Sequence, residues 1–278
     1  MLDAWEGVDA GKWAARLLVD HVEFHEEVGS TNDRARELAL SGAPVPALVV
    51  ANRQTAGRGR HGRPWASNHP GGLWMSLTDE GGAFAPLLPL IAGAAVLRGV
   101  EACLERARQP ALSLKWPNDV YLGGQKLAGI LCESAEGTVV VGIGVNVNQG
   151  AEDLPTDGDV PPVSLRMLRG SATDKGQVLE AILAAWRQLR EELEAGRRPG
   201  APARVPEALL SELNGRSAVY GAAVAVQGTA RHSNGRLGPI EDDSATGGLI
   251  QGDGALVIRT RAQTVEMIAG SVRILGGR

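Results

Sequence analysis

Four β-prone segments follow one another in the middle of the chain, with gaps too short to hold a helix. They cover residues 112–116, 120–122, 127–133 and 138–146. Gly123-Gly124 and Glu136-Gly137 lie in hairpin-length gaps, so neighbouring strands can run antiparallel. Apolar residues recur at steps of three and four over 87–104 and 178–193, which is typical of core-facing helices. The pattern predicts an α+β domain with helices on a mixed, largely antiparallel sheet.

Three further segments precede this block, and the first 24 residues show no clear pair of elements. A helix is expected over 31–40, where Ser30 and Asp33 match a capping-box pattern. Short strands are expected over 47–51 and 73–77.

The pattern of the sequence changes after the Gly- and Pro-rich linker 196–202. Short β-type runs separated by Gly, Asn and Asp follow at 219–227, 249–250, 255–259 and 264–268. This spacing predicts a small all-β barrel or sandwich. We therefore expect two domains, residues 1–210 and 211–278. The stretch 228–248 is long and polar for such a domain.

Composition narrows the classes of protein that the chain can belong to. It has 278 residues with a net charge of −4, so no global basic field attracts nucleic acid, and specific DNA binding is not expected. The two cysteines are too few for a disulfide framework. No apolar run reaches the about 18 residues that a membrane span needs. We expect a cytoplasmic protein without a membrane segment.

The arginine loop, residues 52–65, is the first candidate site. It carries four Arg and no acid, interleaved with Gly57, Gly59 and Gly62. Guanidinium groups and backbone N–H groups suit a phosphate or a carboxylate. A solvated, mobile basic loop remains the alternative. A dinucleotide fingerprint is excluded because Pro64 follows where a helix should open.

A second candidate lies on the predicted hairpin between residues 115 and 126. Its layout brings Lys115, Asn118, Asp119 and Lys126 to one end of the sheet. Two ammonium groups, an amide and a carboxylate suit a nucleotide phosphate and its Mg²⁺. The alternative is structural: Lys115 pairs with Asp119, Asn118 caps the turn and Lys126 is solvated.

Taken together, these blocks resemble the biotin–protein ligases of the BirA type. The matching stretches are Gly29-Ser30-Thr31-Asn32, the run from Gln54 to Trp65, Lys115-Trp116-Pro117-Asn118-Asp119, Lys126-Leu127-Ala128-Gly129-Ile130-Leu131 and Gly142-Ile143-Gly144-Val145-Asn146. The resemblance implies a class II synthetase-like catalytic domain followed by an SH3-like barrel. It also implies ATP and Mg²⁺ as cofactors, biotin as substrate, and a biotin carboxyl carrier protein as acceptor. Such enzymes make biotinyl-5′-AMP, and a carrier lysine then attacks it.

The resemblance also assigns roles to residues. It implies a biotin-binding set: Ser30, Thr31, Asn32, Gln54, Arg58, Gly59, Arg60 and Lys126. It implies an ATP-binding set: Arg58, Arg63, Trp65, Asn118 and Asn146. Arg60, Lys126 and Asp119 are the expected catalytic residues, and Asp119 is the expected metal ligand.

Further expectations concern the N-terminal region, the oligomeric state and the alternative functions. Only 29 residues precede Ser30, so we expect a form without the N-terminal DNA-binding domain of the repressor members. A homodimer is compatible with the resemblance. A lipoate–protein ligase-like enzyme and a non-catalytic biotin- or nucleotide-binding regulator are the alternatives.

Overall fold

The computed structural model describes residues 1–104, 111–156, 158, 160–198 and 200–275. The helices are α1 (Ala10–Leu17), α2 (Thr31–Leu40), α3 (Leu88–Cys103), α4 (Leu165–Arg169), α5 (Lys175–Ala195) and α6 (Glu207–Gly215). The first strands are β1 (Ala4–Trp5), β2 (Val8–Asp9), β3 (His21–Val28), β4 (Ala47–Gln54) and β5 (Leu73–Asp79). The middle strands are β6 (Leu112–Lys115), β7 (Asp119–Leu122), β8 (Gln125–Ala135) and β9 (Thr138–Val145). The last strands are β10 (Ala223–Arg231), β11 (Leu237–Ile250), β12 (Leu256–Arg259) and β13 (Thr264–Ile274).

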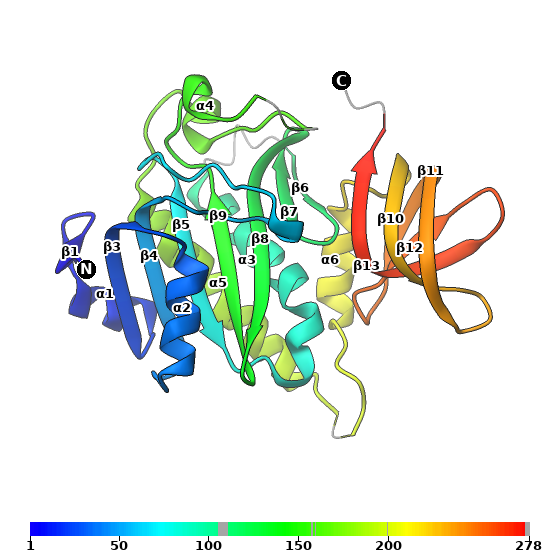
Figure 1. Cartoon of the computed structure of the whole chain (residues 1–278), viewed down its shortest axis with the longest axis horizontal. Coiled ribbons are helices and arrows are strands. Elements are labelled where there is room, and N and C mark those ends of the chain that lie inside the picture. The colour runs from blue at the N-terminus through cyan, green and yellow to red at the C-terminus, as the bar shows by residue number, and fades with distance from the viewer. Residues whose placement is uncertain (105–110, 157, 159, 199, 276–278) are drawn as a thin grey trace.

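The main sheet has seven strands among the described residues, in the order β3-β4-β5-β9-β8-β7-β6. Only β3 and β4 pair in parallel within it, because α2 forms the crossover between them. The other neighbouring pairs are antiparallel. The predicted mixed, largely antiparallel sheet with helices is confirmed (Figure 1).

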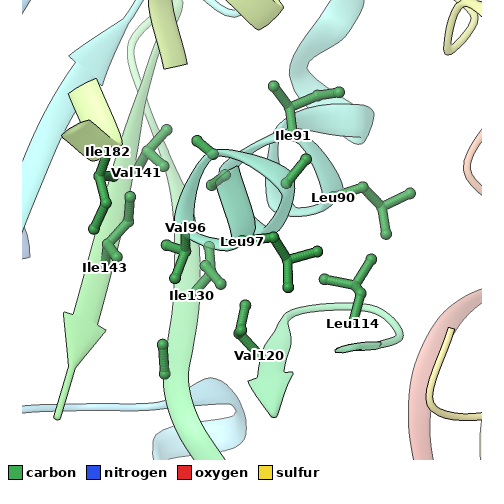
Figure 2. Packing of buried hydrophobic residues seen from close by; sticks show 14 of the residues in the cluster. Leu90, Ile91, Val96, Leu97, Leu114, Val120, Ile130, Val141, Ile143 and Ile182 are labelled. Atoms are coloured by element: carbon green, nitrogen blue, oxygen red, sulfur yellow. The ribbon is translucent and has the colours of Figure 1, made fainter. Parts of the chain in front are cut away.

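Helices cover the sheet on both faces. In Figure 1, α2 lies in front of the strands and α3 and α5 lie behind them. The central core forms on the α3 side, where Leu97, Val120 and Ile130 are among the buried side chains (Figure 2). α3 also packs closely on α5, because a Cβ added at Gly99 would lie 2.7 Å from the backbone of Ile182. The apolar spacing of these two helices is thus explained by their burial.

The segment Gly82–Cys103 is long and apolar enough to cross a membrane, by length and composition alone. Arg98 and Glu101 interrupt the segment, so it contains no unbroken apolar run of about 18 residues. Most of the segment is buried against the sheet and α5, as expected of a core helix.

The first 24 residues do contain elements, so the expectation of no clear element pair is wrong. β1 and β2 form a small antiparallel hairpin, and α1 follows it directly. The rings of Trp5 and Phe24 stack at 5.2 Å, and the indole N–H of Trp13 donates to the carbonyl oxygen of Trp5 at 2.9 Å. This aromatic cluster stabilises strands of two residues, and it has no periodic signature in the sequence.

α2 has the predicted bounds, but its predicted capping box is wrong. Ser30 is the N-cap residue, yet its side chain makes no capping hydrogen bond. The backbone N–H of Thr31 donates instead to Oε1 of Gln54 at 2.8 Å. A side chain from β4 thus satisfies an N–H group at the start of the helix.

The C-terminal strands β10, β11, β12 and β13 form a closed barrel, which confirms the predicted SH3-like domain. The polar stretch 228–248 supplies the end of β10, a turn and most of β11. The domain division proposed after residue 210 falls inside α6. The indole N–H of Trp116 donates to the carbonyl oxygen of Gly254 at 2.9 Å, which joins the main sheet to the barrel.

Glu23→Gln is expected to lower the free energy of unfolding at neutral pH. The Glu23 side chain is 2% exposed and accepts two hydrogen bonds of 2.8 Å from Arg34, which helps to attach α2 to β3. These bonds, together with smaller contributions from hydrogen bonds to His25 and His21, lower the pKa of the Glu23 carboxyl from 4.5 to about 2. Since Arg34 is partly exposed, we expect a loss of about 2 kcal/mol, measured by urea unfolding.

The pH dependence of this loss follows from the sign of the pKa shift. A carboxyl with a lowered pKa stabilises the fold above its ordinary pKa of 4.5, and this stabilisation disappears as the pH falls towards 2. The difference between wild type and Glu23→Gln should therefore shrink below pH 4.5. Glu27→Gln, an exposed position on the same strand, is the control. Equal effects of the two variants at neutral pH would contradict the account.

Candidate functional site

One cavity of about 940 Å³ gathers the residues predicted for the site. The main sheet, the arginine loop and the barrel all contribute side chains to it. Its lining includes Ser30, Thr31, Asn32, Gln54, Arg58, Gly59, Arg60, Arg63, Trp65, Asn118, Asp119, Lys126 and Asn146. Residues more than a hundred positions apart in the sequence are thus brought to one place.

One end of the cavity is polar and uncharged. Oε1 of Gln54 accepts hydrogen bonds from the backbone N–H of Thr31 at 2.8 Å and from its hydroxyl at 3.1 Å. The Ser76 hydroxyl lies 2.8 Å from Oγ1 of Thr31 and 2.6 Å from Oδ1 of Asn32. These groups form a fixed array of donors and acceptors, suited to a neutral polar ring.

Asn32 connects this neutral end to β8 and β9, which form the floor of the cavity. Its amide donates to the carbonyl oxygen of Leu131 at 3.3 Å and to Oε2 of Glu133 at 2.7 Å. A Cβ at Gly142 would overlap Oδ1 of Asn32, so the absence of a side chain there lets the amide lie against β9. This explains one glycine of the predicted Gly142–Asn146 motif.

The arginine loop forms a hairpin over residues 57–65, which we call the arginine hairpin. β4 continues to Gln54, so the loop begins later than predicted. The N–H of Trp65 donates to the carbonyl oxygen of Gly57 at 2.9 Å, and that of Gly59 donates to Arg63 at 2.7 Å. At its tip, His61 has a φ of 56°. Arg63 is exposed near this tip.

The guanidinium group of Arg60 lies in the cavity, and its hydrogen-bond partners are neutral groups. Its guanidinium donates to Oδ1 of Asn118 at 3.3 Å and to the carbonyl oxygen of Gly270, in β13 of the barrel, at 2.9 Å. Burial lowers the pKa of Arg60, and the nearby Asp119 opposes this shift. The side chain therefore spans from the hairpin to the barrel and suits an incoming anion.

Asp119 lies between two lysines at the same end. Its Oδ1 is 2.9 Å from Nζ of Lys126 and its Oδ2 is 3.4 Å from Nζ of Lys115. Burial lowers the pKa of Lys115. The structural pairing of Lys115 with Asp119 is thus present, but Lys126 is not simply solvated. Asn118 donates to the carbonyl oxygen of Ile130 at 2.7 Å, which fixes the turn before β7.

Trp65 lies over two glycines of the floor. A Cβ at Gly129 would be 3.0 Å from its ring, and a Cβ at Gly144 would be 2.6 Å from its Nε1. Nζ of Lys126 lies 5.1 Å from the ring centroid. Among the described residues the buried indole N–H has no hydrogen-bond partner, which is a costly state that a ligand or a ring movement would relieve.

Asn146 supports this floor from the end of β9. Its amide donates to the carbonyl oxygen of Lys126 at 3.4 Å, and its Oδ1 accepts from Gln149 at 3.3 Å. The residue is buried and holds the backbone next to Lys126 in place.

Further residues line the cavity or form hydrogen bonds with the residues that line it. Ser76 is buried beneath the neutral end, and Asp33 holds Arg58 through two hydrogen bonds of 2.7 and 2.6 Å. The barrel adds Gln227, Glu241, Asp243, Ser271 and Arg273 to the lining. Asp33 follows the Ser-Thr-Asn block directly, which was a usable signal. The barrel residues had no such signal, because their place depends on the packing of distant segments.

A protein-family model described as the biotin/lipoate A/B protein ligase family matches residues 25–149. This range contains the neutral end, the arginine hairpin, Asp119 and Lys126.

Relatives and a solved structure point to the same family. A biotin–[acetyl-CoA-carboxylase] ligase from Paracoccus denitrificans is 41% identical over 179 residues, which are 59% of this chain and 71% of that protein. A bifunctional ligase/repressor BirA from Bacillus spizizenii is 39% identical over 178 residues, 61% of this chain; the match covers 54% of the relative, about half its length. A biotin protein ligase from Aquifex aeolicus, solved in complex with biotin and ATP, aligns with a TM-score of 0.75 and 27% identity over 92% of this chain and 99% of that chain. The chain belongs to the biotin/lipoate A/B protein ligase family.

Proposed function

We propose that this chain activates biotin with ATP to biotinyl-5′-AMP and transfers the biotin to a lysine of a biotin carboxyl carrier protein. The observation that carries the proposal is the division of one cavity into a neutral polar end and a cationic end. Biotin has the matching form, with an uncharged ureido ring at one end and a carboxylate at the other.

In the first half-reaction, the neutral end holds the ring and the cationic end holds the reacting groups. Ser30, Thr31, Asn32 and Gln54 are the proposed ring-binding residues, and Ser76 orients two of them. The biotin carboxylate oxygen attacks the α-phosphorus of ATP, and pyrophosphate leaves. Negative charge increases on the oxygens between the two reacting centres, where Lys126 and Arg60 would stabilise it.

The ATP side of the cavity is proposed to include Arg58, Arg63, Trp65, Asn118 and Asn146. Trp65 offers a ring face for the adenine, and Arg63 offers an exposed guanidinium near the hairpin tip. Gly59 keeps the backbone between Arg58 and Arg60 free of a side chain. Asn118 and Asn146 donate to the backbone carbonyl oxygens of Ile130 and Lys126 and so hold β8 next to these groups.

Mg²⁺ fits this site only together with ATP. No group of three or more His, Cys, Asp or Glu side chains that could hold a metal ion occurs in the described part of the chain. Mg²⁺ is usually held by one or two carboxylates plus phosphate oxygens and water. Asp119 would supply the carboxylate, and the ion would neutralise charge on the triphosphate.

In the second half-reaction, the carrier lysine loses its proton and its amine attacks the carbonyl carbon of the mixed anhydride. An amide bond forms and AMP leaves. No covalent enzyme intermediate is needed, so the residues act by positioning and by electrostatic stabilisation.

Release of pyrophosphate from ATP, measured with biotin, with lipoate and without either acid, tests the proposal. Biotin-dependent release, followed by labelling of a carrier domain, is the expected result. Lipoate-dependent release alone would assign the lipoate ligase activity instead. Biotin binding without pyrophosphate release would identify a non-catalytic regulator and contradict the proposal.

A further inference from the structure

The arginine hairpin is attached to the main domain by contacts of different strength along its length. Just before it, the N–H of Ala56 donates to the carbonyl oxygen of Gly29 at 2.7 Å, which fixes its base by backbone bonding. At its tip, the side chain of Arg60 donates to neutral acceptors on β13 and on the turn before β7. Between base and tip, Arg58 makes the ionic contacts.

Those ionic contacts go to two carboxylates. Arg58 donates from both terminal nitrogens to Asp33, at 2.7 and 2.6 Å, in the paired geometry that makes arginine–carboxylate contacts strong. The nearer guanidinium nitrogen also lies 3.9 Å from Oε2 of Glu133. The charge of Arg58 is therefore compensated by the protein itself, whereas Arg60 donates to neutral groups.

Asp33 also belongs to the helix turn that builds the neutral end of the cavity. Thr31 and Asn32 precede it in the first turn of α2. Asn32 donates to the same oxygen of Glu133 that approaches Arg58. The ring-binding residues and the arginine hairpin are thus connected through one helix turn and one shared carboxylate.

We propose that Asp33 is a positioning residue: through Arg58 it fixes the middle of the arginine hairpin, between base and tip, to α2 and leaves Arg60 as the arginine that responds to the bound anion. The assignment rests on the proposed function for its effect on the adenylate. Its structural part, the tether itself, holds for the ligand-free protein. Asp33 does not touch the reacting groups; it acts through Arg58.

The first experiment measures trypsin cleavage after Arg60 in the ligand-free protein. Asp33→Asn keeps the size of the side chain but removes its charge, and we expect cleavage about tenfold faster than in wild type. Glu37→Gln is the matched control, because Glu37 pairs with Arg34 on the same helix and is exposed. Since the Asp33–Arg58 pair is partly exposed, added salt should move the wild-type rate towards that of Asp33→Asn.

The second experiment uses Arg58→Gln, which removes the same ion pair from the hairpin side without altering α2. If the two residues act through one contact, Asp33→Asn/Arg58→Gln should be cleaved no faster than the faster single variant. Additive effects would overturn the assignment. Asp33→Glu keeps a carboxylate and is expected to recover most of the wild-type resistance.

The third experiment measures the reaction at saturating biotin and ATP. We expect Asp33→Asn to form adenylate at a rate within about twofold of wild type but to release it about tenfold faster, because the hairpin no longer holds it. Wild-type behaviour of Asp33→Asn in both cleavage and adenylate release would overturn the proposal. If wild type itself released no pyrophosphate with biotin, the proposed function would fail, and ligand-free cleavage would still decide the role of Asp33.

Discussion

Lys126→Ala is expected to slow formation of biotinyl-5′-AMP by about 100- to 1000-fold, with a much smaller change in biotin affinity. Nζ of Lys126 lies 2.9 Å from Asp119, at the cationic end of the cavity. In the proposed reaction, negative charge on the oxygens between the carboxylate and the α-phosphorus increases as the carboxylate attacks. Removing one such contact typically costs about 2.7–4 kcal/mol in the barrier. Pre-steady-state pyrophosphate release measures the rate, and calorimetric titration with biotin measures the affinity.

Two further variants make this result specific. Lys12→Ala removes an exposed lysine from α1 outside the cavity and should behave as wild type. Lys126→Arg keeps the charge but changes the donor geometry, so it should recover part of the rate. Formation of adenylate by Lys126→Ala at the wild-type rate would show that Lys126 has another role.

Arg60→Gly is expected to release biotinyl-5′-AMP before the carrier lysine arrives, so that bystander lysines become biotinylated. The wild-type guanidinium can bind phosphate and carboxylate oxygens, at about 1.5–3 kcal/mol for each charge-assisted hydrogen bond. Each 1.4 kcal/mol lost speeds escape by about tenfold if the loss appears in dissociation. The half-life of the trapped adenylate and the labelling of an unrelated protein are the two measurements.

Arg60→Ala separates the side chain from the backbone in this prediction. It removes the same hydrogen bonds to Asn118 and Gly270 without the extra backbone freedom of glycine. Faster escape in both variants, and fastest in Arg60→Gly, is expected. An unchanged adenylate lifetime together with lost synthesis would make Arg60 an ATP-binding residue instead.

The sequence predicted most of the large elements because their patterns report burial directly. The apolar repeat over 87–104 became α3, which packs between the sheet and α5, and the repeat over 178–193 became part of α5. The predicted helix 31–40 has the observed bounds of α2. In such segments, one buried face determines the spacing of apolar residues.

The elements that the sequence missed have no regular spacing of apolar residues that would mark them. β11 was recognised only at its end, because much of its first half is exposed and its residues are polar. β1 and β2 depend on the aromatic cluster of Trp5, Trp13 and Phe24. Neither the exposed half of β11 nor the aromatic cluster produces a regular spacing of apolar residues in the sequence.

In the site, the motif residues could be assigned from the sequence, but the residues that hold them in place through hydrogen bonds could not. The Ser-Thr-Asn, arginine and Lys-Trp-Pro-Asn-Asp blocks all line one cavity. Ser76 lies on β5 and Glu133 lies on β8, and both form hydrogen bonds with Asn32. Their role is visible only once the order and register of the strands are known. The contact of Arg60 with Gly270 spans 210 positions and likewise appears only in the folded chain.

The most direct test of the account is a single-turnover chase. The enzyme is incubated with biotin and ATP, freed of unbound ligands by rapid gel filtration, and mixed with an unmodified carrier domain in the absence of ATP. The account predicts nearly one biotin transferred per bound adenylate, with release of AMP. Carrier labelling that occurs only when fresh ATP is supplied would contradict it.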